Sequence, residues 1–136
     1  AKRLKPHLKL EILEGPEENA PDNISPGEIG VILSKEGKFF LDKMKEGDYN
    51  IALDLDGKAL TSPEIAQTVE AEAMMKGKTV NFLIGGSLGI AREVKDKCHL
   101  KISFGRATFP HQLIRVFVVE QIYRAVKIIR HEPYHK

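Results

Sequence analysis

Hydrophobic and polar residues alternate along the chain with two different periods, and this alternation divides it into strands and helices. The segment LKLEIL (8–13) alternates apolar with polar positions, which indicates a strand. YNIALDL (49–55) and HLKISF (99–104) have the same character. TVNFLI (79–84) is apolar except at Asn81, as expected of a strand that is covered on both faces. The pattern therefore predicts four strands.

Helix signals separate these strands. SPGE (25–28) and TSPE (61–64) each place a capping hydroxyl, a proline and a glutamate in the order that begins a helix. The predicted helices run from 25 to about 45, from 63 to 76 before a glycine, and from about 91 to 97. Strands that alternate with helices predict one domain, residues 1–136, of the α/β class, with a mainly parallel sheet flanked by helices.

The last element, LIRVFVVEQIYRAVKIIR (113–130), has features of both structures. Its β-branched residues suggest a strand, whereas its length and the spacing of its polar positions favour a helix. Such a helix has a narrow polar stripe and is apolar on most other faces, so it needs cover on more than one side. We therefore expect a homodimer formed through this helix.

Composition and charge narrow the class of protein. The chain has 136 residues, 42% hydrophobic and 29% charged, which suits one globular core, and no apolar run is long enough to span a membrane. Its 21 basic and 19 acidic residues do not make a generally basic coat for nucleic acid. Basic residues between Arg115 and Lys136 indicate either an anionic partner or a solvated helix face. A single cysteine, Cys98, permits no internal disulfide and fits a reducing compartment, so we expect a cytoplasmic protein.

The carboxyl ends of parallel strands meet at one edge of a sheet, where ligands bind. Three loops are grouped there: LDLDGK (53–58), IGGSLG (84–89) and FGRATFPHQ (104–112). The glycines fit neither the dinucleotide fingerprint nor a phosphate-binding P-loop, so a structural turn and a close approach to a ligand both stay open. Asp54 and Asp56 are acid/base candidates but are more often turn residues. No residue set has the spacing of a metal site.

Four segments together resemble one family. LDLDGK, LIGGSLG, SFGRATFPHQLIRVFVVEQIYRA and HEPYHK occur in order and at fitting spacing, and the likeness extends over nearly the whole chain. This combination is similar to the RlmH-type methyltransferases of the SPOUT class, which act on N3 of a pseudouridine in 23S ribosomal RNA of the large subunit. The resemblance implies a trefoil knot in the C-terminal part, S-adenosyl-L-methionine bound in it, and a homodimer whose site is completed by the partner.

The resemblance also implies functional positions. Those that match the family's cofactor contacts are Leu53, Gly85, Gly86, Phe104, Gly105, Arg106, Ala107, Thr108 and Phe109. For catalysis we predict His135 as base or orienter, Tyr134 as a stacking platform and Arg124 as an anion clamp. For RNA contact we predict Arg115, His111 and Lys136. The alternative for each is a surface tail or a solvated helix face.

Other functions compete with this one. A nicotinamide-dependent enzyme is disfavoured by the glycine spacing, while a non-catalytic ribosome-binding or RNA-binding dimer and a purely structural dimerisation domain stay open. Relatives of this type are expected to start with about 20 further residues that include a first strand, whose absence would leave an unpaired position in the sheet.

Overall fold

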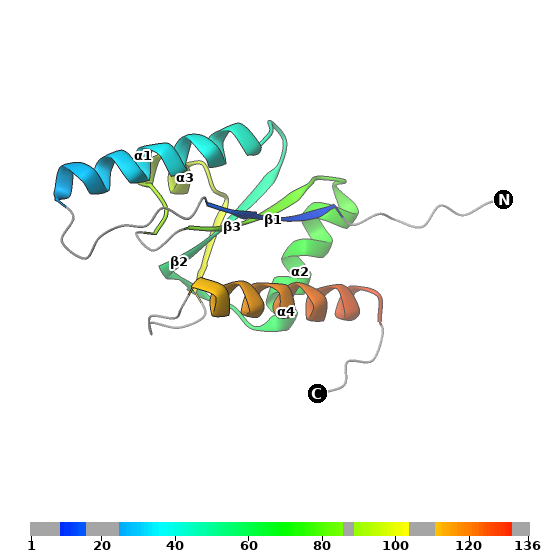
Figure 1. The fold of residues 1–136 in the computed structure, drawn as a ribbon. Coiled ribbons are helices and arrows are strands. Elements are labelled where there is room, and N and C mark those ends of the chain that lie inside the picture. The colour runs from blue at the N-terminus through cyan, green and yellow to red at the C-terminus, as the bar shows by residue number, and fades with distance from the viewer. Residues whose placement is uncertain (1–8, 16–24, 86–88, 104–110, 132–136) are drawn as a thin grey trace.

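The computed structural model describes residues 9–15, 25–85, 89–103 and 111–131 (Figure 1). Within them, four parallel strands form one sheet in the order β1-β3-β2-β4. The strands are β1 (Leu10–Glu14), β2 (Tyr49–Ala59), β3 (Val80–Ile84) and β4 (Leu100–Ser103). The helices are α1 (Pro26–Lys43), α2 (Ser62–Val69), which continues as the π-helix η1 (Glu70–Met75), α3 (Arg92–Asp96) and α4 (His111–Ile129). The predicted α/β fold with a parallel sheet is confirmed.

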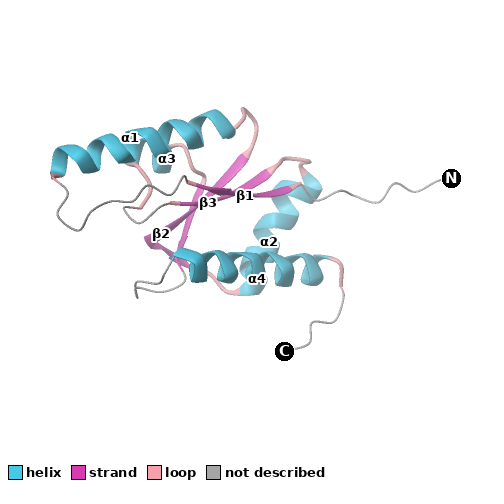
Figure 2. Ribbon diagram, viewed as in Figure 1, coloured by secondary structure: helices cyan, strands magenta, loops and turns pink. Residues whose placement is uncertain are grey.

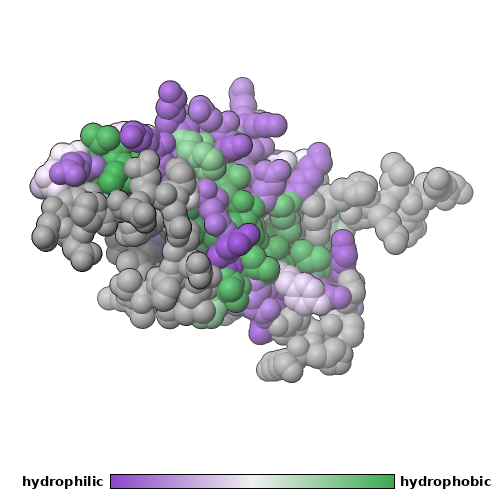
Figure 3. Space-filling model, in the orientation of Figure 1, coloured by the Kyte–Doolittle hydropathy of each residue, from purple (hydrophilic) through white to green (hydrophobic). Residues whose placement is uncertain are grey.

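The helices cover both faces of the sheet (Figure 2). On one face α2, η1 and α4 pack on β3 residues such as Phe82, and on the other face α1 and α3 pack on Leu83. All five residues of β3 are buried, as predicted for a strand with two covered faces. Figure 3 shows hydrophobic residues running through the middle of one side of the molecule, between polar side chains. The path through 86–88 and 104–110 lies outside the described residues, so the knot stays a prediction.

Both predicted helix starts are confirmed. The Ser25 hydroxyl accepts a hydrogen bond from the backbone N–H of Glu28 at 3.2 Å. Thr61 and Glu64 form a complete capping box: the Thr61 hydroxyl accepts from the Glu64 N–H at 3.3 Å, and the Glu64 carboxylate accepts from the Thr61 N–H at 2.8 Å. Hydrogen bonding of the Glu64 carboxylate to Thr61, mainly to its backbone N–H, lowers the pKa of Glu64. The last helix is also helical throughout, as its length and polar spacing predicted.

The polar residue inside β3 belongs to a hydrogen-bond network at the amino ends of the strands. The Asn81 amide donates to the Asp48 carboxylate at 2.9 Å and to the Asn50 side-chain oxygen at 2.8 Å. The backbone N–H of Asn50 in turn donates to Nδ1 of His99 at 3.0 Å. This network joins β3, β2 and the start of β4 at the end of the sheet opposite the predicted ligand edge.

The segment 53–58 differs from the prediction. It is not a loop after a strand, because β2 continues to Ala59. Pairing with β4 is interrupted instead: Leu53 and Lys58 both lie opposite Ile102, so the residues between them form a bulge. Gly57 lies so close to β4 that a Cβ there would be 2.7 Å from the backbone nitrogen of Ile102.

Candidate functional site

The carboxyl ends of the strands bring two predicted cofactor positions together. Ala52 is paired with Leu83, so Leu53 at the end of the regular part of β2 is adjacent to the end of β3, which Gly85 follows. Leu53 also pairs with Ile102 of β4. Its side chain is half-buried and packs on the core. The described residues therefore place Leu53 and Gly85 at one edge, where β4 also ends.

The glycine turn is packed against itself. A Cβ at Gly85 would lie 2.6 Å from the carbonyl oxygen of Gly89 and 2.7 Å from Cγ1 of Ile90. Gly89 has a φ of +86°, which favours glycine. The close approach to Gly85 in the described residues is therefore made by the same turn, and Ile90 leads the chain into the core beneath α1 and α3.

A buried carboxylate that the sequence interpretation missed lies beside this turn. The N–H of Gly15, just after β1, donates to the Ile84 carbonyl at 2.9 Å. A Cβ at Gly15 would lie 2.6 Å from Oε2 of Glu36, a side chain of α1 that is only 4% exposed. The family resemblance, which extends over nearly the whole chain, was the one signal that could have singled out Glu36.

The two arginines predicted on α4 both form ion pairs. Arg115 pairs with Glu14 at the end of β1, which fixes the first part of α4 to the carboxyl edge of the sheet. Nε of Arg124 lies 2.7 Å from the carboxylate of Glu120, one turn earlier on the same helix. Arg124 lies nine residues after Arg115, which is roughly 14 Å along the helix. Because α4 runs antiparallel to the strands (Figure 1), this distance leads away from the carboxyl edge. Within one chain, Arg124 is thus not brought next to Leu53 and Gly85.

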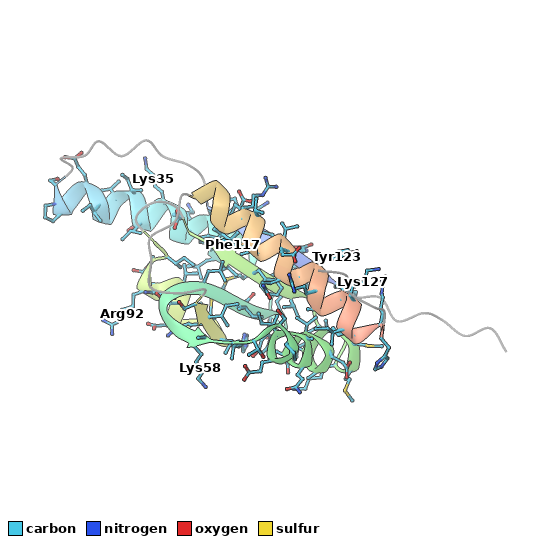
Figure 4. All side chains as sticks on the ribbon, turned by 90° about the horizontal axis from the view of Figure 1, so that it is seen from below. Lys35, Lys58, Arg92, Phe117, Tyr123 and Lys127 are labelled. Atoms are coloured by element: carbon cyan, nitrogen blue, oxygen red, sulfur yellow. The ribbon has the colours of Figure 1, made fainter. Side chains whose placement is uncertain are left out.

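The outer face of α4 is apolar. Val116, Val119 and Tyr123 follow one another at helical spacing and are 60%, 48% and 51% exposed. The ammonium of Lys127 lies over the ring of Tyr123, 5.5 Å from the centroid, in a cation–π contact (Figure 4). This face is the part of the long helix that its sequence predicts to be covered by a partner.

Several predicted positions lie outside the described residues: Gly86, residues 104–109, Tyr134, His135 and Lys136. His111 begins α4, but its side chain is not described. In the described part of the chain, no three His, Cys, Asp or Glu side chains form a group that could hold a metal ion. No helix there is long and apolar enough to cross a membrane.

Comparison with known proteins identifies the family. The family described as predicted SPOUT methyltransferase matches residues 1–135. This chain belongs to that family. A curated protein of Carboxydothermus hydrogenoformans, named ribosomal RNA large subunit methyltransferase H, is 49% identical over 99% of this chain and 85% of its own length. A protein of the same name from Clostridioides difficile is 48% identical over the same shares, and one from Clostridium botulinum is 45% identical over 100% of this chain and 86% of its own length.

As a SPOUT methyltransferase, the protein requires a methyl donor. Two of the positions predicted to contact the donor lie at the carboxyl edge of the sheet. Leu53 offers a partly exposed apolar side chain there. Gly85 has no side chain, and Gly89 and Ile90 of the same turn occupy the space where its Cβ would lie. The three relatives all carry the name ribosomal RNA large subunit methyltransferase H, which agrees with the resemblance to the RlmH type.

Proposed function

We propose that this SPOUT methyltransferase methylates ribosomal RNA of the large subunit, at N3 of a pseudouridine in 23S rRNA, with S-adenosylmethionine as donor. The observation that carries the proposal is the near full-length likeness to proteins named ribosomal RNA large subunit methyltransferase H. The convergence of Leu53 and Gly85 at the carboxyl edge of the sheet agrees with it, because the family resemblance implies both residues as donor contacts. A reaction on ribosomes implies a cytoplasmic enzyme.

On the donor side, the chain supplies position rather than reactive groups. Bound S-adenosylmethionine supplies an electrophilic methyl group on its sulfonium. Leu53 would pack against the nucleoside, and backbone groups at Gly85 and in 104–109 would hold it in line with the acceptor. The ion pair between Arg115 and Glu14 connects α4, the helix that follows 104–109, to the sheet edge.

On the acceptor side, the chain must remove a proton. N3–H of pseudouridine is weakly acidic, so its anion requires a base or a nearby cation. We assign His135 as base or orienter, Tyr134 as the stacking platform and Arg124 as the clamp for the developing anion. Arg124 is paired with Glu120, so contact with the anion would require its guanidinium to bind the anion in addition to Glu120 or in its place.

The position of Arg124 favours a shared site. It lies well along α4 from the carboxyl edge of its own chain, next to the exposed apolar face formed by Val116, Val119 and Tyr123. A second copy packed on this face would cover these side chains and could present its own Arg124 to the donor edge. We therefore propose a homodimer through α4.

Transfer of labelled methyl from S-adenosylmethionine to ribosomes that lack this modification tests the function. We expect incorporation into 23S rRNA that is lost when the acceptor pseudouridine is replaced by uridine. Deleting residues 131–136 should abolish transfer and leave donor affinity, measured by calorimetry, nearly unchanged. Donor binding without any methyl transfer by the full chain would instead indicate a non-catalytic RNA-binding dimer.

Light scattering after size exclusion tests the dimer separately. The full chain should have the mass of two copies, and Val119→Glu should give the mass of one. Val31→Glu is a matched control, because Val31 is an apolar residue on α1 that is 55% exposed. A monomeric full chain, or a Val119→Glu variant that stays dimeric, would contradict the interface.

A further inference from the structure

A charged pocket opens on the side of the sheet away from α4. Its volume is about 390 Å³, and its lining comes from β2, α3 and β4: Asp54, Arg92, Lys95, Asp96 and Lys101. Ile102 faces the core beneath α2 and α4, so its neighbour Lys101 faces the opposite side, where α3 lies. The pocket is thus distinct from the surface of α4 that carries Arg115, one of the predicted RNA contacts.

The charges in the pocket are only partly compensated. Nζ of Lys95 lies 3.4 Å from a carboxylate oxygen of Asp54, and both side chains are largely buried, at 28% and 16% exposed. Among the described residues, neither Arg92 nor Lys101 makes an ion pair. Three cations and two carboxylates leave one net positive charge, which is the complement of a single phosphodiester.

The position of the pocket connects it with the donor edge. Asp54 directly follows Leu53, at the point where β2 leaves its regular pairing with β4. Arg92 begins α3, two residues after Ile90, which packs against the glycine turn. Figure 4 shows the Arg92 side chain pointing outward, where a large partner can reach it. An anion in the pocket would therefore lie beside the two segments that carry the predicted donor contacts.

We propose that this pocket binds one backbone phosphate of the ribosomal RNA substrate. Arg92 would hold two phosphate oxygens with its planar guanidinium, and Lys101 would add a point charge. Asp54 holds Lys95 in place, and Asp96 limits the pocket to a single phosphate by reducing its charge. This inference rests on the proposed function and adds a second anchor for the RNA, separate from α4. Such a contact positions the RNA and reads no sequence.

The double variant Arg92→Gln with Lys101→Gln tests the anchor. Affinity for ribosomes or for a transcript of the substrate stem-loop is measured over a series of KCl concentrations. Each phosphate contact that is lost should reduce the slope of log K against log salt by about 0.7 to 0.9. We expect a smaller slope, a higher KM for the RNA, and unchanged affinity for S-adenosylmethionine. Lys97→Gln is the matched control, because Lys97 is exposed just after α3 and does not line the pocket.

Asp96→Asn supplies a change of the opposite sign. It raises the net charge of the pocket, so RNA should bind more tightly at low salt, a result that misfolding cannot produce. An unchanged slope in the double variant, or an equal loss in Lys97→Gln, would overturn the proposal while leaving methylation by the unmodified chain intact. If the unmodified chain neither binds nor methylates the RNA, the proposed function is wrong and this anchor is wrong with it.

Discussion

Adding one methyl group at Gly85 should test how tightly the turn at the ligand edge is packed. In Gly85→Ala the new Cβ would lie 2.6 Å and 2.7 Å from the carbonyl oxygen and carbon of Gly89, and 2.7 Å from Cγ1 of Ile90. Two of these three atoms belong to the backbone, so rotation of a side chain cannot relieve the contact. Overpacking of this kind costs about 1–3 kcal/mol. We therefore expect the free energy of unfolding to fall by that amount.

Urea unfolding followed by circular dichroism measures the effect at one fixed protein concentration. Gly30→Ala is the matched control: it makes the same chemical change in the interior of α1, where a Cβ would meet nothing within 4 Å. That control should raise stability by about 0.5–1 kcal/mol, because alanine favours the helix over glycine. If Gly85→Ala unfolds at the same urea concentration as the unmodified chain, the packing argument is refuted.

Three further changes have defined expectations. Thr61→Ala removes the capping box and should lower the free energy of unfolding by about 0.5–2 kcal/mol in the same urea assay, whereas no loss would show that the cap is dispensable. Glu14→Gln breaks an ion pair whose side chains are 32% and 63% exposed, so the loss should stay below about 1 kcal/mol, and a larger one would contradict the view of a partly solvated pair. Burial raises the pKa of the Cys98 thiol from 9.0 to about 11. At pH 8, iodoacetamide should alkylate Cys98 about 100-fold more slowly in the folded protein than in the protein unfolded in urea. Because the pKa of this thiol is higher in the folded state, its contribution to the free energy of unfolding should be complete below pH 9 and should be lost as the pH rises toward 11.

The elements of the fold were predictable because their signals are local. Capping residues at Ser25 and Thr61, and the apolar run of β3, decide structure within a few residues of themselves. The bulge in β2 was not predictable, since Asp54 to Gly57 has the composition of a turn that ends a strand. Only contact with Ile102 of β4 returns the chain to the sheet.

The π-helix η1 had no signal of its own for a similar reason. The N–H of Lys76 bonds the Ala71 carbonyl at 3.2 Å, five residues back, in a segment whose composition suits an ordinary helix. The candidate site was predictable where strand ends converge, at Leu53 and Gly85. The ion pair between Glu14 and Arg115 was not, because the two residues are far apart in sequence and only the packing of α4 on the sheet brings them together.

The order of the strands has a consequence for how the protein is made. Leu10 of β1 lies opposite Val80 of β3, so β1 has no neighbour among the described strands until β3 has been synthesised. Ladders between segments so distant in sequence form late and slowly, on a timescale of milliseconds to seconds in domains rich in such pairings. A nascent chain paused before Val80 therefore lacks the strand on which β1 pairs, and synthesis through Ile84 supplies that partner.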